Sequence, residues 1–395
     1  MTVELKHPMK ADHTADELAR SRFVSGIRSL VLNDLAADMR GAYDNRAKPA
    51  FEKQHGRPPE NSREAHLALR GDPAFNIYSA MRVQAQKMVW AAVADSVARE
   101  GERLATEAQN AADAPGALTL DPDLAIPRNV DALDVHLMPG SYTRGQQSLE
   151  AGAVYDRGLA VFSMGLMGAN LDDIGLSMAG YISNRYPDFR PERILDTGCT
   201  IGHNTLPWKQ TYPEAEVVAI DAAPGPLVYG SARAKMQGQE VHFRQMCADA
   251  LRFEDESFDL VWSSMFLHEL SGKQRDAAIA EAYRVLRPGG LMLHMELPPN
   301  DQMDAFDGFY LDWDAYYNNE PYYKAFRDAV PQAICTKAGF GADDYFDFVV
   351  PSVGIYGEEE VRKAALGDRA EAVGQQTTGR LADGVMWFGF GAWKR

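Results

Sequence analysis

The stretch at residues 193–203 constrains the fold most, because a short apolar run there ends in an acid and two glycines and then opens into a helical pattern. This order of residue types predicts a buried strand, a tight turn and the start of a helix. Gly198 and Gly202 lack a Cβ atom, so the backbone can turn sharply and a ligand can approach it closely. The N-terminus of the following helix presents unpaired N–H groups. Such a turn suits a nucleotide-like ligand in an α/β fold.

The spacing of the glycines narrows the choice of ligand. A dinucleotide-binding turn has the pattern Gly-x-Gly-x-x-Gly, followed by an acid about twenty residues later. Here Asp196, Gly198, Thr200 and Gly202 stand at alternate positions, so an acid precedes the first glycine. The third glycine of the dinucleotide pattern is missing.

Two further acids follow the next two predicted strands. The apolar run at residues 216–221 ends in Asp221, which is placed to accept hydrogen bonds from ribose hydroxyls. Residues 241–246 predict the next strand, and Asp249 comes shortly after it. Three acids at the ends of successive strands would therefore meet at one edge of the sheet.

Two more motifs follow these acids in the sequence: a strand at residues 258–262, and a sharp turn into a strand at residues 286–294. Together the five ordered motifs resemble the class I S-adenosylmethionine-dependent methyltransferases over roughly residues 150–395. The resemblance implies an α/β fold with a Rossmann-like seven-stranded sheet, helices on both faces and S-adenosylmethionine as cofactor. It also implies that residues 345–350 and 385–393 supply the sixth and seventh strands, the last one antiparallel to the others.

The resemblance assigns cofactor contacts residue by residue. Asp221 is expected to bind the ribose and Asp249 to accept a hydrogen bond from the adenine amino group. Thr200 stands where the family usually has glycine, which narrows the space beside the ligand but leaves a hydroxyl for hydrogen bonding. Arg144, in a loop before the core, could pair with the methionine carboxylate or remain solvated. The full expected cofactor set is Asp196, Gly198, Thr200, Gly202, Asp221, Ala222, Asp249, Ala250, Ser263 and Arg144.

A histidine follows the fourth strand of the predicted core. Ligands in open α/β sheets lie outside the carboxyl ends of the strands, so His268 should face the transferred methyl group. In plant-type O-methyltransferases the corresponding histidine is the general base, whereas in other members it is structural. We expect His268 to be the catalytic residue and to take a proton from a phenol or hydroxyl, with Glu269 as a candidate orienting partner.

Residues 298–340 combine many aromatic side chains with many acids and predict a lid over the substrate. Aromatic density of this kind suggests a pocket wall for a flat or apolar substrate. The carboxylates would also suit a cationic amine. The structural alternative is a solvated acidic helix with one aromatic face packed on the sheet. The expected pocket residues are Glu296, Phe309, Tyr310, Trp313 and Tyr317.

Residues 1–145 are expected to form an all-helical domain in front of a methyltransferase domain at residues 146–395. Apolar residues recur at helical spacing in residues 16–47 and again in residues 62–111. Residues 112–132 have the composition of a loop. By resemblance to small-molecule O-methyltransferases, the helices could cap the pocket and form a homodimer; alternatively, they only pack against the sheet domain.

Charge and composition bear on the partners. The net charge of −16 would repel a phosphate backbone and argues against nucleic acid. Cys199, Cys247 and Cys335 stand singly, without the spacing of metal ligands, so we expect a reducing cytoplasm and no bound metal. Neither a signal peptide nor a run long enough to span a membrane is expected.

The function implied by the resemblance is methyl transfer to oxygen, or to an activated carbon, of a small aromatic or apolar acceptor. Methylation of an amine or thioether is the alternative within the same cofactor class. From other classes, a nicotinamide dehydrogenase or a non-catalytic S-adenosylmethionine-binding protein remain open, although the missing third glycine argues against the dehydrogenase.

Overall fold

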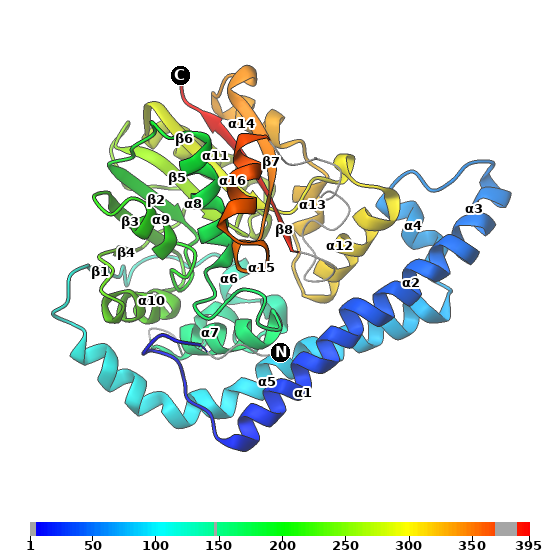
Figure 1. The fold of residues 1–395 in the computed structure, drawn as a ribbon, viewed down its shortest axis with the longest axis horizontal. Helices are drawn as coiled ribbons and strands as arrows, with labels where there is room; N and C mark the ends of the chain where they lie inside the picture. The colour runs from blue at the N-terminus through cyan, green and yellow to red at the C-terminus, as the bar shows by residue number, and fades with distance from the viewer. Residues whose placement is uncertain (1–4, 146–147, 368–384) are drawn as a thin grey trace.

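The computed structural model describes residues 5–145, 148–367 and 385–395, and one eight-stranded sheet forms its core (Figure 1). The strand order is β1-β4-β3-β2-β5-β6-β8-β7. The strands are β1 Leu118–Thr119, β2 Arg193–Thr197, β3 Glu216–Asp221, β4 His242–Gln245, β5 Phe258–Ser264, β6 Leu286–Glu296, β7 Tyr345–Pro351 and β8 Met386–Trp393.

The pairing of the strands confirms the expected α/β sheet. β1 to β6 pair in parallel, and β8 runs antiparallel to both β6 and β7. The strand count differs from seven because β1, which pairs Leu118 with Phe243, lies in the segment expected to be a loop. The turn expected before the fifth core strand is a register shift within the β5–β6 pairing, where residues 287–290 have no partner on β5.

Buried side chains cover both faces of the sheet because neighbouring residues of a strand point to opposite sides. Ile194 and Leu260 belong to one buried apolar cluster, whereas Leu195 and Val261 belong to another. The first cluster includes residues of α8 and α9, and the second includes residues of α11 and α14. The core helices are α7 Glu150–Phe162, α8 Asp173–Arg185, α9 Leu206–Thr211, α10 Pro224–Met236, α11 Gly272–Val285, α14 Pro331–Ala338, α15 Val353–Tyr356 and α16 Glu358–Leu366.

The N-terminal helices form an arm that runs along one side of the core and projects beyond it (Figure 1). They are α1 Ala15–Ser29, α2 Ala36–Ala42, α3 Lys48–His55, α4 Ser62–Leu69 and α5 Pro73–Asn110, with α6 Arg128–Asp131 after them. Their buried apolar residues join two clusters, one shared with the lid and one shared with α7 and α10. Among the described residues, no helix is both long and apolar enough to cross a membrane.

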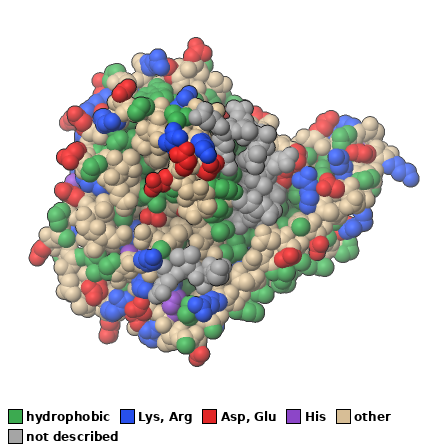
Figure 2. All heavy atoms as spheres, viewed as in Figure 1, with side chains coloured by type: hydrophobic (Ala, Val, Ile, Leu, Met, Phe, Trp, Pro, Cys, Tyr) green, Lys and Arg blue, Asp and Glu red, His purple; other side chains and the backbone are tan. Residues whose placement is uncertain are grey.

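Some apolar side chains of the arm remain exposed. Hydrophobic side chains gather along the outer edge of the arm in Figure 2. Phe23 of α1 and Ile77 of α5 are more than half exposed, and Leu30 is also exposed. Acidic and basic side chains are interspersed over the rest of the face shown in Figure 2.

The lid helices α12 Ala305–Tyr317 and α13 Tyr323–Arg327 lie between the sheet and the arm (Figure 1). The aromatic face of α12 packs on the N-terminal helices and not on the sheet: Trp313 contacts the rings of His66 and Phe75. Several acids of the lid form ion pairs, among them Asp307 with Arg40, Asp312 with Arg327 and Asp314 with Arg82.

Candidate active site

The turn after β2 has the backbone that its glycines require. Gly198 and Gly202 have φ angles of 78° and 70°. A Cβ atom at position 198 would lie 2.2 Å from the ring of Phe266, so only glycine fits there. Thr200 also has a positive φ angle, 50°, and its N–H donates to Oδ2 of Asp221 at 2.9 Å. The Asp221 carboxylate therefore holds Thr200 in a backbone conformation that glycine would adopt easily.

A first cavity lies outside the carboxyl ends of the strands and is lined by Thr200, Asp221, Ala222 and Asp249. Asp221 and Asp249 thus face the same space. Oδ1 of Asp221 accepts the N–H of Ala223, and its Oδ2 accepts that of Thr200. Burial raises the pKa of Asp221, although these backbone donors oppose the shift. The lining also offers apolar contacts to a purine, among them Met246, Ala248, Phe266 and Leu270.

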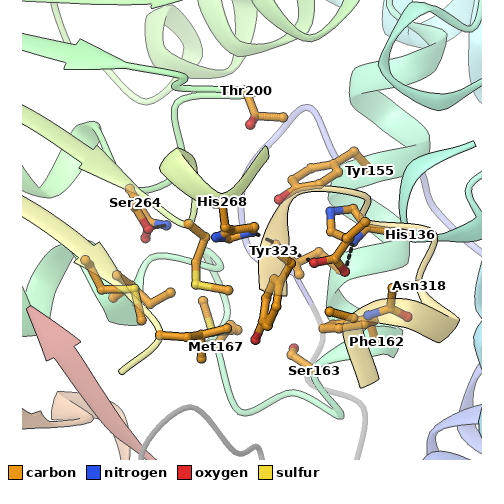
Figure 3. A pocket seen from close by; sticks show the side chains of 18 of the residues that line it. His136, Tyr155, Phe162, Ser163, Met167, Thr200, Ser264, His268, Asn318 and Tyr323 are labelled. Carbon is orange, nitrogen blue, oxygen red and sulfur yellow. Dashed lines mark hydrogen bonds and ion pairs between the residues drawn. The ribbon is translucent and has the colours of Figure 1, made fainter. Parts of the chain in front are cut away.

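A second cavity shares Tyr142, Gly198, Thr200 and Met265 with the first, so the two meet at the turn. Asp196 lines the second cavity, and burial raises its pKa to about 7 even though the Thr205 hydroxyl donates to it. Figure 3 shows the arrangement within this cavity: Thr200 lies at one end, Phe162 and Ser163 lie at the other, and His268, His136 and Tyr323 lie between them.

His268 is held in the second cavity by the buried carboxylate of Glu296. Its Nδ1 lies 2.6 Å from Oε2 of Glu296, while the other oxygen accepts the N–H groups of Phe266 and Leu267. Burial lowers the pKa of His268, but the charge of Glu296 and this hydrogen bond outweigh it and raise the pKa to about 9. The orienting carboxylate is therefore Glu296 and not the neighbouring Glu269, whose Oε1 lies 3.8 Å from Nε2 of His268.

His136 joins the site from the segment before the core. Its Nδ1 lies 3.1 Å from Oε1 of Glu320, and its Nε2 lies 3.3 Å from Oε1 of Glu269. Burial lowers its pKa, but the charge of Glu320 and hydrogen bonds to both glutamates raise it to about 10. The backbone of His136 has a φ angle of 57°, and its carbonyl accepts hydrogen bonds from Gln86 and Trp90 at 2.8 Å each. The long helix α5 thus fixes the imidazole between two carboxylates.

These three side chains also have the geometry of a metal-binding group. His136, Glu269 and Glu320 each offer a ligand atom, and these atoms lie within 4.8 Å of one another. The protonated imidazole already supplies a positive charge between the two carboxylates, which is the role that a divalent cation would otherwise take.

Four residues expected at the cofactor, all within the described part of the chain, line neither cavity. One of them, Gly202, lies in the glycine turn, where a Cβ atom would meet the ring of Phe243 at 2.8 Å. Ser263 is fully buried, and its hydroxyl lies 2.7 Å from Nδ1 of His294; the next residue, Ser264, lines the second cavity. Ala250 is exposed, and Ala248 lines the first cavity in its place. Arg144 donates from Nε to Glu150 at 2.6 Å and, among the described residues, is not part of either lining.

The expected pocket wall is also placed differently. Of the five residues, Tyr310 lines the second cavity. Glu296 lies behind His268, and Phe309 is buried against the N-terminal helices. Trp313 donates from its indole to Ser79, and its ring contacts that of Tyr317. The lining also includes residues outside this expected set: Arg28, His136, Tyr155, Glu320 and Tyr323.

Comparison with known proteins agrees with this geometry. Residues 194–290 match the model of a methyltransferase domain family. A demethylmenaquinone methyltransferase from Thermus thermophilus is 38% identical over 109 residues, which are 28% of this chain and 49% of that protein. A malonyl-(acyl-carrier protein) O-methyltransferase from Laribacter hongkongensis is 36% identical over 126 residues, 30% of this chain and 42% of that protein. The chain thus spans less than half the length of each of these relatives.

Among solved structures, phosphoethanolamine N-methyltransferase 2 from Haemonchus contortus in complex with S-adenosylmethionine aligns with 60% of this chain and 57% of that one, at 19% identity and a TM-score of 0.40. In the present chain, the glycine turn, the carboxylates of Asp221 and Asp249 and the apolar lining fit an adenosine. Residues 194–290 are therefore the matched part of a class I S-adenosylmethionine-dependent methyltransferase domain, whose cofactor is S-adenosylmethionine.

Proposed function

We propose that the protein transfers a methyl group to an oxygen, or to an activated carbon, of a small and largely apolar acceptor. The observation that carries this proposal is the second cavity, which begins at the cofactor turn and holds the buried His268–Glu296 pair. Most of its remaining wall is apolar, as expected of a small-molecule site. The apolar side chains include Leu32, Leu159, Phe162, Met167, Leu297 and Leu311.

The residues of the chain would bind, orient and deprotonate the acceptor. S-adenosylmethionine, when bound, supplies an electrophilic methyl group on a sulfonium. Enclosure by the lid and the arm brings the acceptor into line and excludes water. His268 accepts the hydroxyl proton of the acceptor at Nε2, and Glu296 stabilises the imidazolium that results.

Methylation of a cationic amine is supported less well. Of the lid acids that suggested it, Asp307, Asp312 and Asp314 each pair with an arginine of the chain. Glu320 faces His136 in the same way. Each of these carboxylates already pairs with a cation of the chain, so it would bind a cationic substrate only weakly.

We infer that the N-terminal helical segment is the cap of the acceptor site. Arg28 and Leu32 come from its first helices, and His136 and Tyr142 come from its end; all four line the second cavity. A homodimer through the exposed face of the arm, the domain division at residue 145, a cytoplasmic location and the absence of a nucleic-acid partner stay predictions.

Turnover with labelled cofactor tests the proposal. The full chain is incubated with S-adenosylmethionine labelled in its methyl group and with a pool of small phenols, quinols and acids. We expect label in a small product together with an equal amount of S-adenosylhomocysteine, measured by mass spectrometry. Tight cofactor binding without transfer to any acceptor would instead identify a non-catalytic binder, and calorimetric binding of NAD in preference to S-adenosylmethionine would identify a dehydrogenase.

Removal of divalent metals is expected to leave this turnover unchanged. The imidazolium of His136 already neutralises charge between Glu269 and Glu320, so the site needs no added cation to hold its shape. The rate is measured before and after treatment with a strong chelator, and again after addition of Mg²⁺, Mn²⁺ or Zn²⁺. A rate that falls with the chelator and returns with one of these ions would contradict the prediction.

A further inference from the structure

Arg28 of α1 is a buried cation that faces the second cavity. The residue is 1% exposed and lines the cavity. Its Nε donates to the carbonyl of Phe162 at 2.7 Å, and its Nη1 donates to Oε1 of Gln86 at 2.7 Å. The guanidinium carbon also lies 4.1 Å from the centre of the Phe162 ring. In the described parts of the chain, Nη2 has no hydrogen-bond partner and no carboxylate forms an ion pair with Arg28.

The charges around Arg28 leave one positive charge in excess. The neighbouring Arg82 is also fully buried, and it donates to the Asp314 carboxylate from both Nε and Nη2. Gln86 accepts from both arginines through the same Oε1 atom. Two guanidinium groups thus share one carboxylate. Burial, followed by the charge of Arg82, lowers the pKa of Arg28 to about 9. An unpaired buried charge is costly, so an anion at Nη2 would be strongly favoured.

The position of Arg28 places this charge away from the cofactor. Phe162, on which the guanidinium lies, is at the opposite end of the cavity from Thr200 in Figure 3. Gln86, which holds Nη1, also donates to the carbonyl of His136. Gln86 therefore links Arg28 to His136, which lies between Thr200 and Phe162 in the cavity (Figure 3).

We propose that Arg28 binds a carboxylate of the methyl acceptor, so that the acceptor is an apolar or aromatic acid with its nucleophilic atom at His268. A singly charged group balances the single excess charge, whereas a phosphate dianion would overcompensate it. One free guanidinium nitrogen suits a charge-assisted hydrogen bond to one carboxylate oxygen. This assignment rests on the proposed function, because it names the class of acceptor for the same site.

Paired ligands that differ only in charge test the assignment. Aromatic and aliphatic acids and their matching amides, such as 4-hydroxyphenylpropionate and its amide, are titrated calorimetrically into the full chain with S-adenosylhomocysteine bound. The wild-type protein is expected to prefer acid over amide by about tenfold or more in at least one pair, as for a hydrogen bond to a charged group. Arg28→Met should abolish that preference. No preference in any pair for the wild-type protein would overturn the proposal.

Two further variants serve as controls for this test. Arg20→Met removes an exposed arginine of the same helix, which pairs with Asp95, and should leave the preference intact. Arg28→Gln keeps a donor for Phe162 or Gln86, so it serves if Arg28→Met does not fold; it too should lose the preference. An acid preference that survives in either Arg28 variant would overturn the proposal.

The same design separates this inference from the proposed function. Acid binding that depends on Arg28 but leads to no methyl transfer would contradict the proposed function and still support the acid-binding site. Methyl transfer to a small acceptor by a wild-type protein that binds no acid better than its amide would overturn this inference and leave the proposed function intact.

Discussion

The His268→Gln variant is expected to lose about a hundredfold to ten-thousandfold in kcat, the usual contribution of a general base, while its affinity for S-adenosylmethionine stays close to that of the wild type. Glutamine can still donate to Glu296 but cannot take a proton from the acceptor. His268 lines the second cavity and not the adenosine-shaped first one, so cofactor binding should be spared. Single-turnover rates and calorimetry with the cofactor measure the two effects. The matched control is His55→Gln, which changes an exposed histidine of the arm and should alter neither.

The pH dependence of the reaction provides an independent check on the role of His268. A base must be neutral to act, and the pKa of His268 is raised to about 9. Below that pH the neutral fraction falls tenfold per unit, so kcat/KM should rise with pH and level off above about pH 9. Glu296→Gln removes the carboxylate that raises the pKa, so the rise should move to lower pH. A flat profile in the wild type, combined with an inactive His268→Gln, would make His268 a positioning residue and not a base.

The part of the site that the sequence predicts well is local. The strand, the turn and the acid that follows are encoded within a few residues, because apolar runs of strand length and glycines at left-handed positions are read directly from the chain. Gly198, Asp221 and Asp249 line the first cavity, whereas Asp196, the first of the three expected acids, lines the second. The His268–Glu296 contact is harder to predict from the sequence. It depends on the register of β5 against β6, which pairs Ser264 with Met295, and register is a property of the folded sheet.

The acceptor cavity could not be predicted in the same way, because its lining residues come from segments that are far apart in the sequence. The α12 helix has aromatic residues on several sides, and helical spacing alone does not say which side meets the cavity. The N-terminal helices decide this: Phe309 and Trp313 pack against α4 and α5, which leaves Tyr310 and Asp314 on the cavity side. Arg28 lies more than a hundred residues before the core in sequence, on what the apolar pattern shows only as an amphipathic helix.

Asp221→Asn is expected to weaken the binding of S-adenosylmethionine by about tenfold to a hundredfold, because hydrogen bonds to a charged group contribute roughly 1.5–3 kcal/mol each. Each oxygen of Asp221 accepts one backbone N–H and keeps lone pairs for the ribose hydroxyls. Asparagine replaces one oxygen with a donor, which would face the N–H of Thr200 or of Ala223 and loosen the turn as well. Calorimetry with S-adenosylmethionine and S-adenosylhomocysteine should show the same loss for both, since the change concerns only the nucleoside.

The control for Asp221→Asn is Asp95→Asn, which removes an exposed ion pair with Arg20 and should leave binding unchanged. At saturating cofactor, Asp221→Asn should keep most of its kcat, the opposite of the pattern expected for His268→Gln. The contrast follows from the division of the site into two cavities: one carboxylate holds the nucleoside, and one imidazole handles the acceptor proton. Unchanged cofactor affinity in Asp221→Asn would show that the adenosine does not bind at the first cavity. The assignment of the second cavity as the acceptor site would then be wrong as well.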